Sequence, residues 1–467
     1  MIPDKKEQLL DANERKMLPV ILTLALPTMI EQLLQTAVQY IDTAMVGSLG
    51  TRATAAVGAT TTVNWLIGST VSALGVGLLA VISQAIGAGK PDKARKAAGQ
   101  AVTLVLIAGL LFTAVTVSLS GVIPVWMNVA PEIRRLASRY FLILYSPMLF
   151  RTASIIFGTV LRASGDTKTP MLVGIGVNLI NIILNFFLIY STRIVDVFGK
   201  RITVYGAGFG IEGAAAASAV SFVFGGITIT CVLWRHKKIS PKGQRLRPDM
   251  SILRPCFRIA FPNMLQRFAT SLGYVAFASM INSLGEISTA AHTIANTVES
   301  AFYIPGYGMQ TAAATLSGNA WGEGNKLKLR KLSKTVIPLE LILMAVSGGL
   351  LFIFAPQLMK IFSDDNEVIS LGVTVLRMVA VSEPFYGVPI VIEGMMQGMG
   401  KTAAPFVYNI VGMWAVRIVG TFICTRFIGL GLVSAWGCMI AHNMVLFVLF
   451  TVHFAHLNKK QLSPTRL

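Results

Sequence analysis

Residues 27–50 read PTMIEQLLQTAVQYIDTAMVGSLG, and residues 262–285 read PNMLQRFATSLGYVAFASMINSLG. Each stretch begins with proline, has methionine in third place and ends in Ser-Leu-Gly, at an offset of 235 residues. The same offset aligns further groups without a gap: Thr54–Ala56 with Thr289–Ala291, Gly87 with Gly322, Gly89 with Gly324, Arg95–Lys96 with Arg330–Lys331, and Gly165 and Pro170 with Gly400 and Pro405. A register kept from residue 27 to residue 170 indicates an internal repeat, so we expect two similar halves.

Composition indicates the solvent in which these halves fold. Of the 467 residues, 54% are hydrophobic and 13% are charged, and the mean hydropathy is +0.66. Soluble domains carry about 25% charged residues, and a membrane-spanning helix needs about 20 apolar residues. We therefore predict an all-α membrane protein with twelve transmembrane helices. The expected spans are residues 17–46, 56–84, 99–126, 138–161, 170–190, 209–233, 256–281, 293–318, 335–355, 371–397, 405–425 and 430–456.

Each half contains six predicted spans, and an even number makes both halves enter the membrane from the same side. The two six-helix lobes are then parallel, related by a pseudo-two-fold axis along the membrane normal. We predict an N-lobe at residues 1–233, a cytoplasmic basic linker at 234–255 and a C-lobe at 256–467. Transporters with such repeats bind substrate between the halves and rock them, so the pattern favours a carrier and not an enzyme.

Basic residues predict the orientation. The net charge is +19, from 40 Lys and Arg against 21 Asp and Glu. With the N-terminus in the cytoplasm, 27 of the 40 basic residues fall on the cytoplasmic side and nine outside. This bias predicts a multi-pass protein of the cytoplasmic membrane with both termini inside. We expect the linker to contact anionic lipid headgroups and the protein not to bind nucleic acid. Residues 1–16 are polar and the first apolar run is too long for a signal peptide, so we expect no cleavable leader.

Other familiar site patterns are missing or misplaced. The four cysteines and five histidines form no CxxC or HExxH spacing, so we predict no metal site and no cofactor. No Walker A sequence is present, which argues against direct ATP drive. Gly208–Gly213 fits GxGxxG but would lie at the outer mouth of the sixth span, where its glycines suit a turn and close packing better than a dinucleotide.

Four stretches resemble the multidrug and toxic compound extrusion (MATE) family. They are LPTMIEQLLQTAVQYIDTAMVGSLG in the first span, SQAIGAGKPDKARK after the second, RASGDTKTP before the fifth, and AAHTIANTVESAFYIPGYG leading into the eighth. The resemblance implies an antiporter that exports organic cations or other amphipathic compounds, driven by H⁺ or Na⁺. We expect it to act as a monomer. A flippase for a lipid-linked precursor shares the architecture and is the alternative.

The resemblance also implies an ion-binding site in the N-lobe. Asp42 matches the family's acid in the first span, and Asn178, Asn181 and Asn185 lie where the family has polar residues on the fifth. Other members carry acids in spans 7 and 10 of the C-lobe. This chain has Thr270 and Tyr386 at those places, which points the coupling to Asp42.

The residues support this interpretation of Asp42 independently. An ionisable group inside the membrane is costly unless it meets a partner or a cavity, so it is a functional candidate. The three asparagines are spaced i, i+3 and i+7 and therefore share one helix face, where they can bind a cation or a carboxylate. The alternative is that they only pack helices together, since interhelical asparagines contribute about 0.6 kcal/mol without any ion.

Further polar and aromatic residues within the spans are candidates for a substrate cavity: Glu31, Gln35, Tyr40, Arg267, Glu299, Tyr307 and Glu383. Arg267 and Glu299 have similar depth in neighbouring spans, so they either form an ion pair or contact substrate. Pro27 and Pro262 interrupt helix hydrogen bonds and are either packing kinks or hinges.

The predicted orientation can be tested by labelling. We expect a Lys238→Cys variant to react with a membrane-impermeant thiol reagent only from the cytoplasmic side, because the linker is the most basic connection. Reaction from outside alone would reverse the assigned topology.

Overall fold

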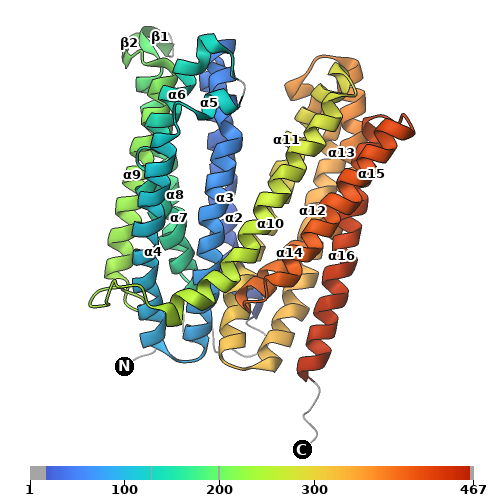
Figure 1. Cartoon of the computed structure of the whole chain (residues 1–467). Helices are drawn as coiled ribbons and strands as arrows, with labels where there is room; N and C mark the ends of the chain where they lie inside the picture. Colours follow the sequence, from blue (N-terminus) through green and yellow to red (C-terminus); the bar gives the residue numbers. More distant parts are fainter. Residues whose placement is uncertain (1–16, 128, 198–199, 463–467) are drawn as a thin grey trace, which may run out of the picture. The chain divides into compact units, whose positions relative to one another are not determined.

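The computed structural model describes residues 17–127, 129–197 and 200–462 (Figure 1). The tails on which the leader and terminus predictions depend lie outside these ranges. The elements of the first half are α2 (Met17–Gly47), α3 (Thr51–Gly87), α4 (Pro91–Ser118), α5 (Ile123–Trp126), α6 (Pro131–Tyr145), α7 (Met148–Ala163), α8 (Lys168–Leu188), β1 (Ser191–Val197), β2 (Lys200–Ala207) and α9 (Gly210–Arg235). Those of the second are α10 (Met250–Asn282), α11 (Glu286–Gly322), α12 (Lys326–Phe362), α13 (Asn366–Gly398), α14 (Ala403–Ile410), π-helix η2 (Val411–Ile418), α15 (Val419–Phe422), π-helix η3 (Ile423–Phe427) and α16 (Leu432–Leu462).

All twelve predicted spans fall on helices in the described chain, although the third crosses the break at residues 119–122 between α4 and α5. The fourth is the pair α6 and α7, bent by 49°, and the eleventh is the run from α14 to η3. Nine described helices are long and apolar enough to cross a membrane, and the bent pair would make ten. The seventh and eighth spans are α10 and α11, with 33 and 37 residues. They are long enough to cross a membrane but are not among these nine helices, because their polar side chains lower the mean hydropathy.

Contacts divide the chain into two compact units, as far as the structure describes them. One contains Met1–Met29, Leu79–Lys90 and Pro255–Leu467, and the other contains Ile30–Leu78 and Pro91–Arg254. We call them the C-unit and the N-unit. These units are defined by contacts between residues, whereas the predicted lobes are continuous ranges of sequence. The two divisions differ because the first part of α2 and the end of α3 belong to the C-unit. The lobe boundaries therefore stay a prediction.

A β-hairpin that the sequence did not predict joins α8 to α9. Strands β1 and β2 pair antiparallel, with Val197 opposite Lys200 at the turn and an irregularity between Ser191 and Arg193. It occupies the connection at which the offset of 235 residues is lost. The GxGxxG sequence follows β2, but its glycines serve a turn and close packing, as expected: Gly208 and Gly210 have φ of 69° and 57°, and a Cβ on Gly213 would collide with the Leu188 carbonyl.

The backbone confirms the repeat. Three pairs of glycines at the offset of 235 residues adopt the same left-handed conformation, which residues with a Cβ rarely adopt. The φ values are 101° and 102° at Gly50 and Gly285, 66° and 68° at Gly89 and Gly324, and 87° and 77° at Gly165 and Gly400. Each pair ends a helix at the same place in both halves.

Within the C-unit, the end of α3 crosses the end of α11 with almost no side chain between them. A Cβ on Gly87 would collide with the carbonyl of Asn319, and a Cβ on Gly322 would collide with the carbonyl of Gln84. Because Gln84 and Asn319 are themselves equivalent by the repeat, the two collisions are one contact seen from each side. Such reciprocity is what a two-fold relation between the halves requires.

This crossing gives a prediction about stability. Gly87→Ala and Gly322→Ala should each destabilise the protein by about 1–3 kcal/mol, since the backbones must separate to admit a methyl group. Gly349→Ala in α12 is the control, because a Cβ there meets nothing within 4 Å. Thermal midpoints of the purified variants in one detergent would check this; a Gly87→Ala midpoint equal to that of the control would contradict it.

Candidate functional site

Asp42 on α2 meets the amide side chains of α8 in the N-unit. Asn185 Nδ2 donates to Asp42 Oδ1 over 2.6 Å. In the amide orientation that satisfies its neighbours, Asn181 Nδ2 lies 2.9 Å from Asp42 Oδ1 and 3.2 Å from Oδ2, and its oxygen accepts from Ser218 Oγ over 3.0 Å. Asn181 and Asn185 are 5% and 1% exposed. Two buried amides thus hold the Asp42 carboxylate, and neither brings a positive charge.

Asn178 belongs to the same face of α8 but is not recorded in this contact. It is half-buried, and the described hydrogen bonds of Asp42 do not include it. Three residues along a helix is a rise of about 4.5 Å, which moves Asn178 away from Asp42. Of the four residues predicted for ion coupling, the structure brings three together.

Glu31, eleven residues before Asp42 on α2, is paired with a cation. Arg162 Nη2 lies 2.6 Å from both carboxylate oxygens, and the two side chains are 20% and 17% exposed. Arg162 begins the RASGDTKTP stretch, which runs from the last turn of α7 to the first turn of α8, and in it Asp166 accepts hydrogen bonds from the Thr169 backbone and hydroxyl. The sequence suggested Glu31 as a cavity residue without identifying this partner.

The C-unit has its own single-carboxylate cluster. Glu393 on α13 accepts hydrogen bonds from Gln266 and Gln397, both over 2.9 Å, and from Asn409 over 3.3 Å. All three donors are neutral amides. The nearby Arg267 contributes a favourable charge interaction without a direct contact.

The repeat relates these two clusters residue by residue. At the offset of 235, Gln266 corresponds to Glu31 and Gln397 to Arg162. The equivalent of Glu393 is Gly158, where a Cβ would lie 3.4 Å from the Arg162 guanidinium. Each half therefore has one carboxylate in the equivalent cluster. In the first half it is Glu31 on α2, the first span, and in the second half it is Glu393 on α13, the fourth span of that half.

No ion pair between Arg267 and Glu299 is recorded in the described chain. Arg267 Nε donates to Asn263 Oδ1 over 3.1 Å, one turn away on its own helix. The positive charge of Arg417 acts on Glu299 electrostatically, and no direct contact between the two side chains is recorded in the described chain. Similar depth does not determine which way a side chain points around its helix, so depth alone cannot assign an ion pair.

Arg417 reaches the interior from the π-helix η2, whose wider turns often occur at functional sites. It is 4% exposed, and its guanidinium lies 4.1 Å from the Phe277 ring and 5.1 Å from the Tyr274 ring. Among the predicted acids of this region, Glu299 is 6% and Glu383 is 1% exposed. Neither Glu383 oxygen has a recorded hydrogen-bond partner in the described chain.

Glu340 is an acid that sequence analysis did not select. It lies on α12, is 0% exposed, and neither of its oxygens has a hydrogen-bond partner in the part of the chain that the structure describes. Its Oε1 fills the space left by Gly306 and Gly387 of the neighbouring helices. A lone carboxylate in the apolar run LELILMAV was the available signal, because charge inside a span is costly.

Aromatic rings adjoin these acids in the C-unit. The Tyr303 ring lies 5.8 Å from Tyr307 and 5.7 Å from Tyr386, with edge-to-face geometry, and the Tyr307 and Tyr386 hydroxyls are 3.3 Å apart. The other cavity candidates, Gln35 and Tyr40, are exposed on α2. Pro27 and Pro262 lie inside the continuous helices α2 and α10, so their hinge role stays a prediction.

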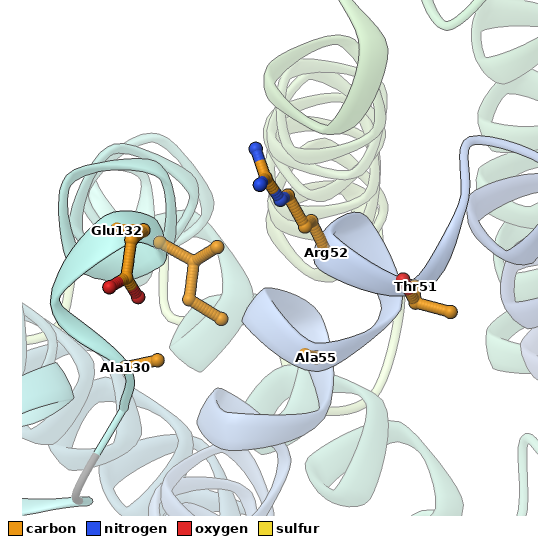
Figure 2. A pocket seen from close by; sticks show the side chains of 6 residues that line it. Thr51, Arg52, Ala55, Ala130 and Glu132 are labelled. Atoms are coloured by element: carbon orange, nitrogen blue, oxygen red, sulfur yellow. The ribbon is translucent and has the colours of Figure 1, made fainter.

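One hollow in the N-unit is shallow and separate from these residues. It has a volume of about 300 Å³ and lies between the start of α3 and the start of α6. Figure 2 shows Arg52 and Glu132 from the two helices on its sides. In the described chain, no group of three or more His, Cys, Asp or Glu side chains could hold a metal ion.

The MatE family model matches residues 27–187 and 262–423, once in each half. The chain belongs to the MatE family. The match confirms the family resemblance found in the sequence and the twelve-helix fold with two repeats. The protein is therefore a multi-span membrane transporter. The flippase alternative is not favoured.

Relatives and solved structures agree with the MatE assignment. The chain is 29% identical over 424 residues to the "probable multidrug resistance protein NorM" of Thermotoga maritima, covering 90% of this chain and 88% of that one. It is 24% identical to the "probable multidrug resistance protein YoeA" of Bacillus subtilis, covering 94% and 93%. A crystal structure described as MATE in complex with MaL6 matches with a TM-score of 0.90 at 24% identity, over 98% and 99% of the chains.

The Glu31–Arg162 pair yields a prediction for this MatE protein. Arg162→Gln should lower stability because it leaves the Glu31 carboxylate without its cation, but by less than the about 3–5 kcal/mol of a fully buried pair, since the Glu31 side chain is 20% exposed. The double variant Glu31→Gln/Arg162→Gln should recover part of the loss, as it installs the amides found at Gln266 and Gln397. Thermal midpoints of the single and double variants check this, and strict additivity of the two changes would contradict it.

Proposed function

We propose that this MatE protein exports organic cations or other amphipathic compounds from the cell in exchange for H⁺ or Na⁺, with Asp42 as the coupling residue. The observation that supports the proposal most is the contact of Asp42 with Asn181 and Asn185. A carboxylate inside a membrane span that neutral donors hold, as in the described part of this chain, can change its charge without breaking an ion pair.

The two amides explain how the charge of Asp42 could control the helices. When Asp42 is ionised, the amide N–H groups of α8 hold its oxygens and so tie α2 to α8. Hydrogen bonds to charged groups contribute about 1.5–3 kcal/mol. A proton on the carboxyl weakens these bonds. A bound Na⁺ would instead be coordinated by amide oxygens beside the carboxylate. Both amide groups would have to rotate so that their oxygens, and not their nitrogens, face Asp42.

The coupling ion can drive a change of conformation only if it binds the two conformations of the protein with sufficiently different affinities. A ligand shifts two conformations only by binding one of them better, and a near-complete switch takes about 5.5 kcal/mol. Two charge-assisted hydrogen bonds approach this amount. Pro27 lies shortly before Met29, after which α2 passes from the C-unit to the N-unit, and we propose that α2 bends there.

Buried acids and tyrosine rings in the C-unit support organic cations as the substrate class. Glu299 and Glu383 lie near Tyr303 in the C-unit, and tyrosine faces attract cations. The relatives named as multidrug resistance proteins favour the same class. A precursor with a pyrophosphate would instead need a predominantly cationic lining.

The proposal predicts the behaviour of Asp42→Asn. This variant should fold and reach the membrane, because it resembles the neutral acid, yet lose gradient-driven efflux of a fluorescent organic cation. Asn185→Ala should also impair efflux strongly, whereas Asn178→Ala should keep most of it, since Asn178 is not recorded in the Asp42 contact.

Collapsing the proton and sodium gradients separately in vesicles identifies the coupling ion for the wild type. Normal gradient-dependent efflux by Asp42→Asn would exclude Asp42 as the coupling residue. The acids of the C-unit would then have to be examined in its place.

A further inference from the structure

We infer that the folded linker between α9 and α10 is a docking surface for anionic phospholipid headgroups. The surface consists of the exposed side chains of Lys242, Arg245, Leu246, Arg247 and Met250, all in the N-unit. We call it the linker surface. The inference does not depend on the proposed transport function.

The linker has a defined shape. His236 Nδ1 accepts from the backbone N–H groups of Lys238 and Ile239, both over 3.3 Å, and Ser240 Oγ donates to the Trp234 carbonyl over 2.7 Å. Ile239 is 0% exposed. Local hydrogen bonds and one buried apolar anchor therefore fold this segment onto the unit.

Two buried side chains of α4 fix the basic part of the linker by its backbone. Gln100 Nε2 donates to the Arg247 carbonyl over 2.9 Å and its Oε1 accepts from the Asp249 N–H over 2.8 Å. Thr103 Oγ1 donates to the Leu246 carbonyl over 2.7 Å. Gln100 and Thr103 are 3% and 5% exposed. Because α4 binds the linker through main-chain atoms, the side chains of Arg245–Arg247 remain on the outside.

Charge on the linker surface is almost entirely positive. Lys242, Arg245 and Arg247 are exposed, and no ion pair of these three is recorded in the described chain. The adjacent acid is Asp249. Hydrogen bonds from the Ser251 side chain and backbone lower the pKa of the Asp249 carboxyl below its usual value, so it stays ionised and offsets one positive charge.

Exposed apolar side chains distinguish a membrane from other anionic partners. Leu246 is 45% exposed between two arginines, and Met250 is 66% exposed at the start of α10. Arginine beside an outward leucine suits the boundary between headgroups and acyl chains. A free phosphate or nucleic acid would leave both apolar side chains in water.

The position along α4 also fits the membrane edge. The contact residues Gln100 and Thr103 are nine and twelve residues from the start of α4 at Pro91, a rise of about 14–18 Å. Figure 1 shows the linker beside the starting end of α4, at the end of the N-unit opposite the hairpin. The linker surface thus lies where the polar first turns of α4 give way to its apolar run.

Lipid titration of the purified full chain tests the inference. Native mass spectrometry would follow binding of phosphatidylglycerol and, separately, phosphatidylcholine. The wild type should prefer phosphatidylglycerol. Arg245→Gln/Arg247→Gln should weaken phosphatidylglycerol binding about twenty-fivefold, at about fivefold per basic residue, and leave phosphatidylcholine binding unchanged. Leu246→Ser/Met250→Ser should weaken it as well.

The control is Lys326→Gln/Lys334→Gln, which removes two exposed charges from the predicted same side of the membrane and should bind as the wild type does. Equal affinity of the wild type for the two lipids would overturn the inference. So would unchanged phosphatidylglycerol binding by either linker variant. Displacement of phosphatidylglycerol by millimolar inorganic phosphate would show a simple anion site and would overturn it too.

Discussion

Close contact between backbones at the crossing of α3 and α11 is the constraint around which the repeat is arranged. In a membrane, helices gain little from burying apolar side chains, because lipid tails are equally apolar, so small residues that allow close packing favour association. Gly87 and Gly322 supply that closeness, each against a carbonyl at the equivalent position of the other half. On the same crossing, Gly318 faces Ser83, its own equivalent. Positions that meet their own counterparts must hold small residues on both sides.

The sequence predicted the repeat and the spans well because both depend on local patterns. Apolar runs of sufficient length mark helices whatever surrounds them, and glycines such as Gly50 and Gly285 mark turns that need a left-handed backbone. The hairpin between α8 and α9 was missed because no Asn-Gly or Asp-Gly turn marks it. The π-helical turns around Arg417 were missed because their widening depends on packing and not on a local motif.

For the candidate site, the sequence identified single charged groups better than their partners. Asp42 was identified as an ionisable group inside a span and by family resemblance, and the asparagines of α8 by their spacing on one helix face. Glu31 and Arg162 bring together two helices far apart in the chain, whose relative rotation no sequence spacing reveals. Glu340 needed no partner to be found, and it should have been selected on its charge alone.

The two single-carboxylate clusters have a consequence for tracing ancestry. If the halves descend from one duplicated gene, the acid has changed its helix while the cluster kept one negative charge, with Glu31 in one copy and Glu393 in the other. A column-by-column comparison of the halves would record three unrelated differences: Glu31 against Gln266, Gly158 against Glu393 and Arg162 against Gln397. In space the same chemical feature persists. Selection on such a membrane protein can therefore preserve a charge at a location while the residue that supplies it drifts.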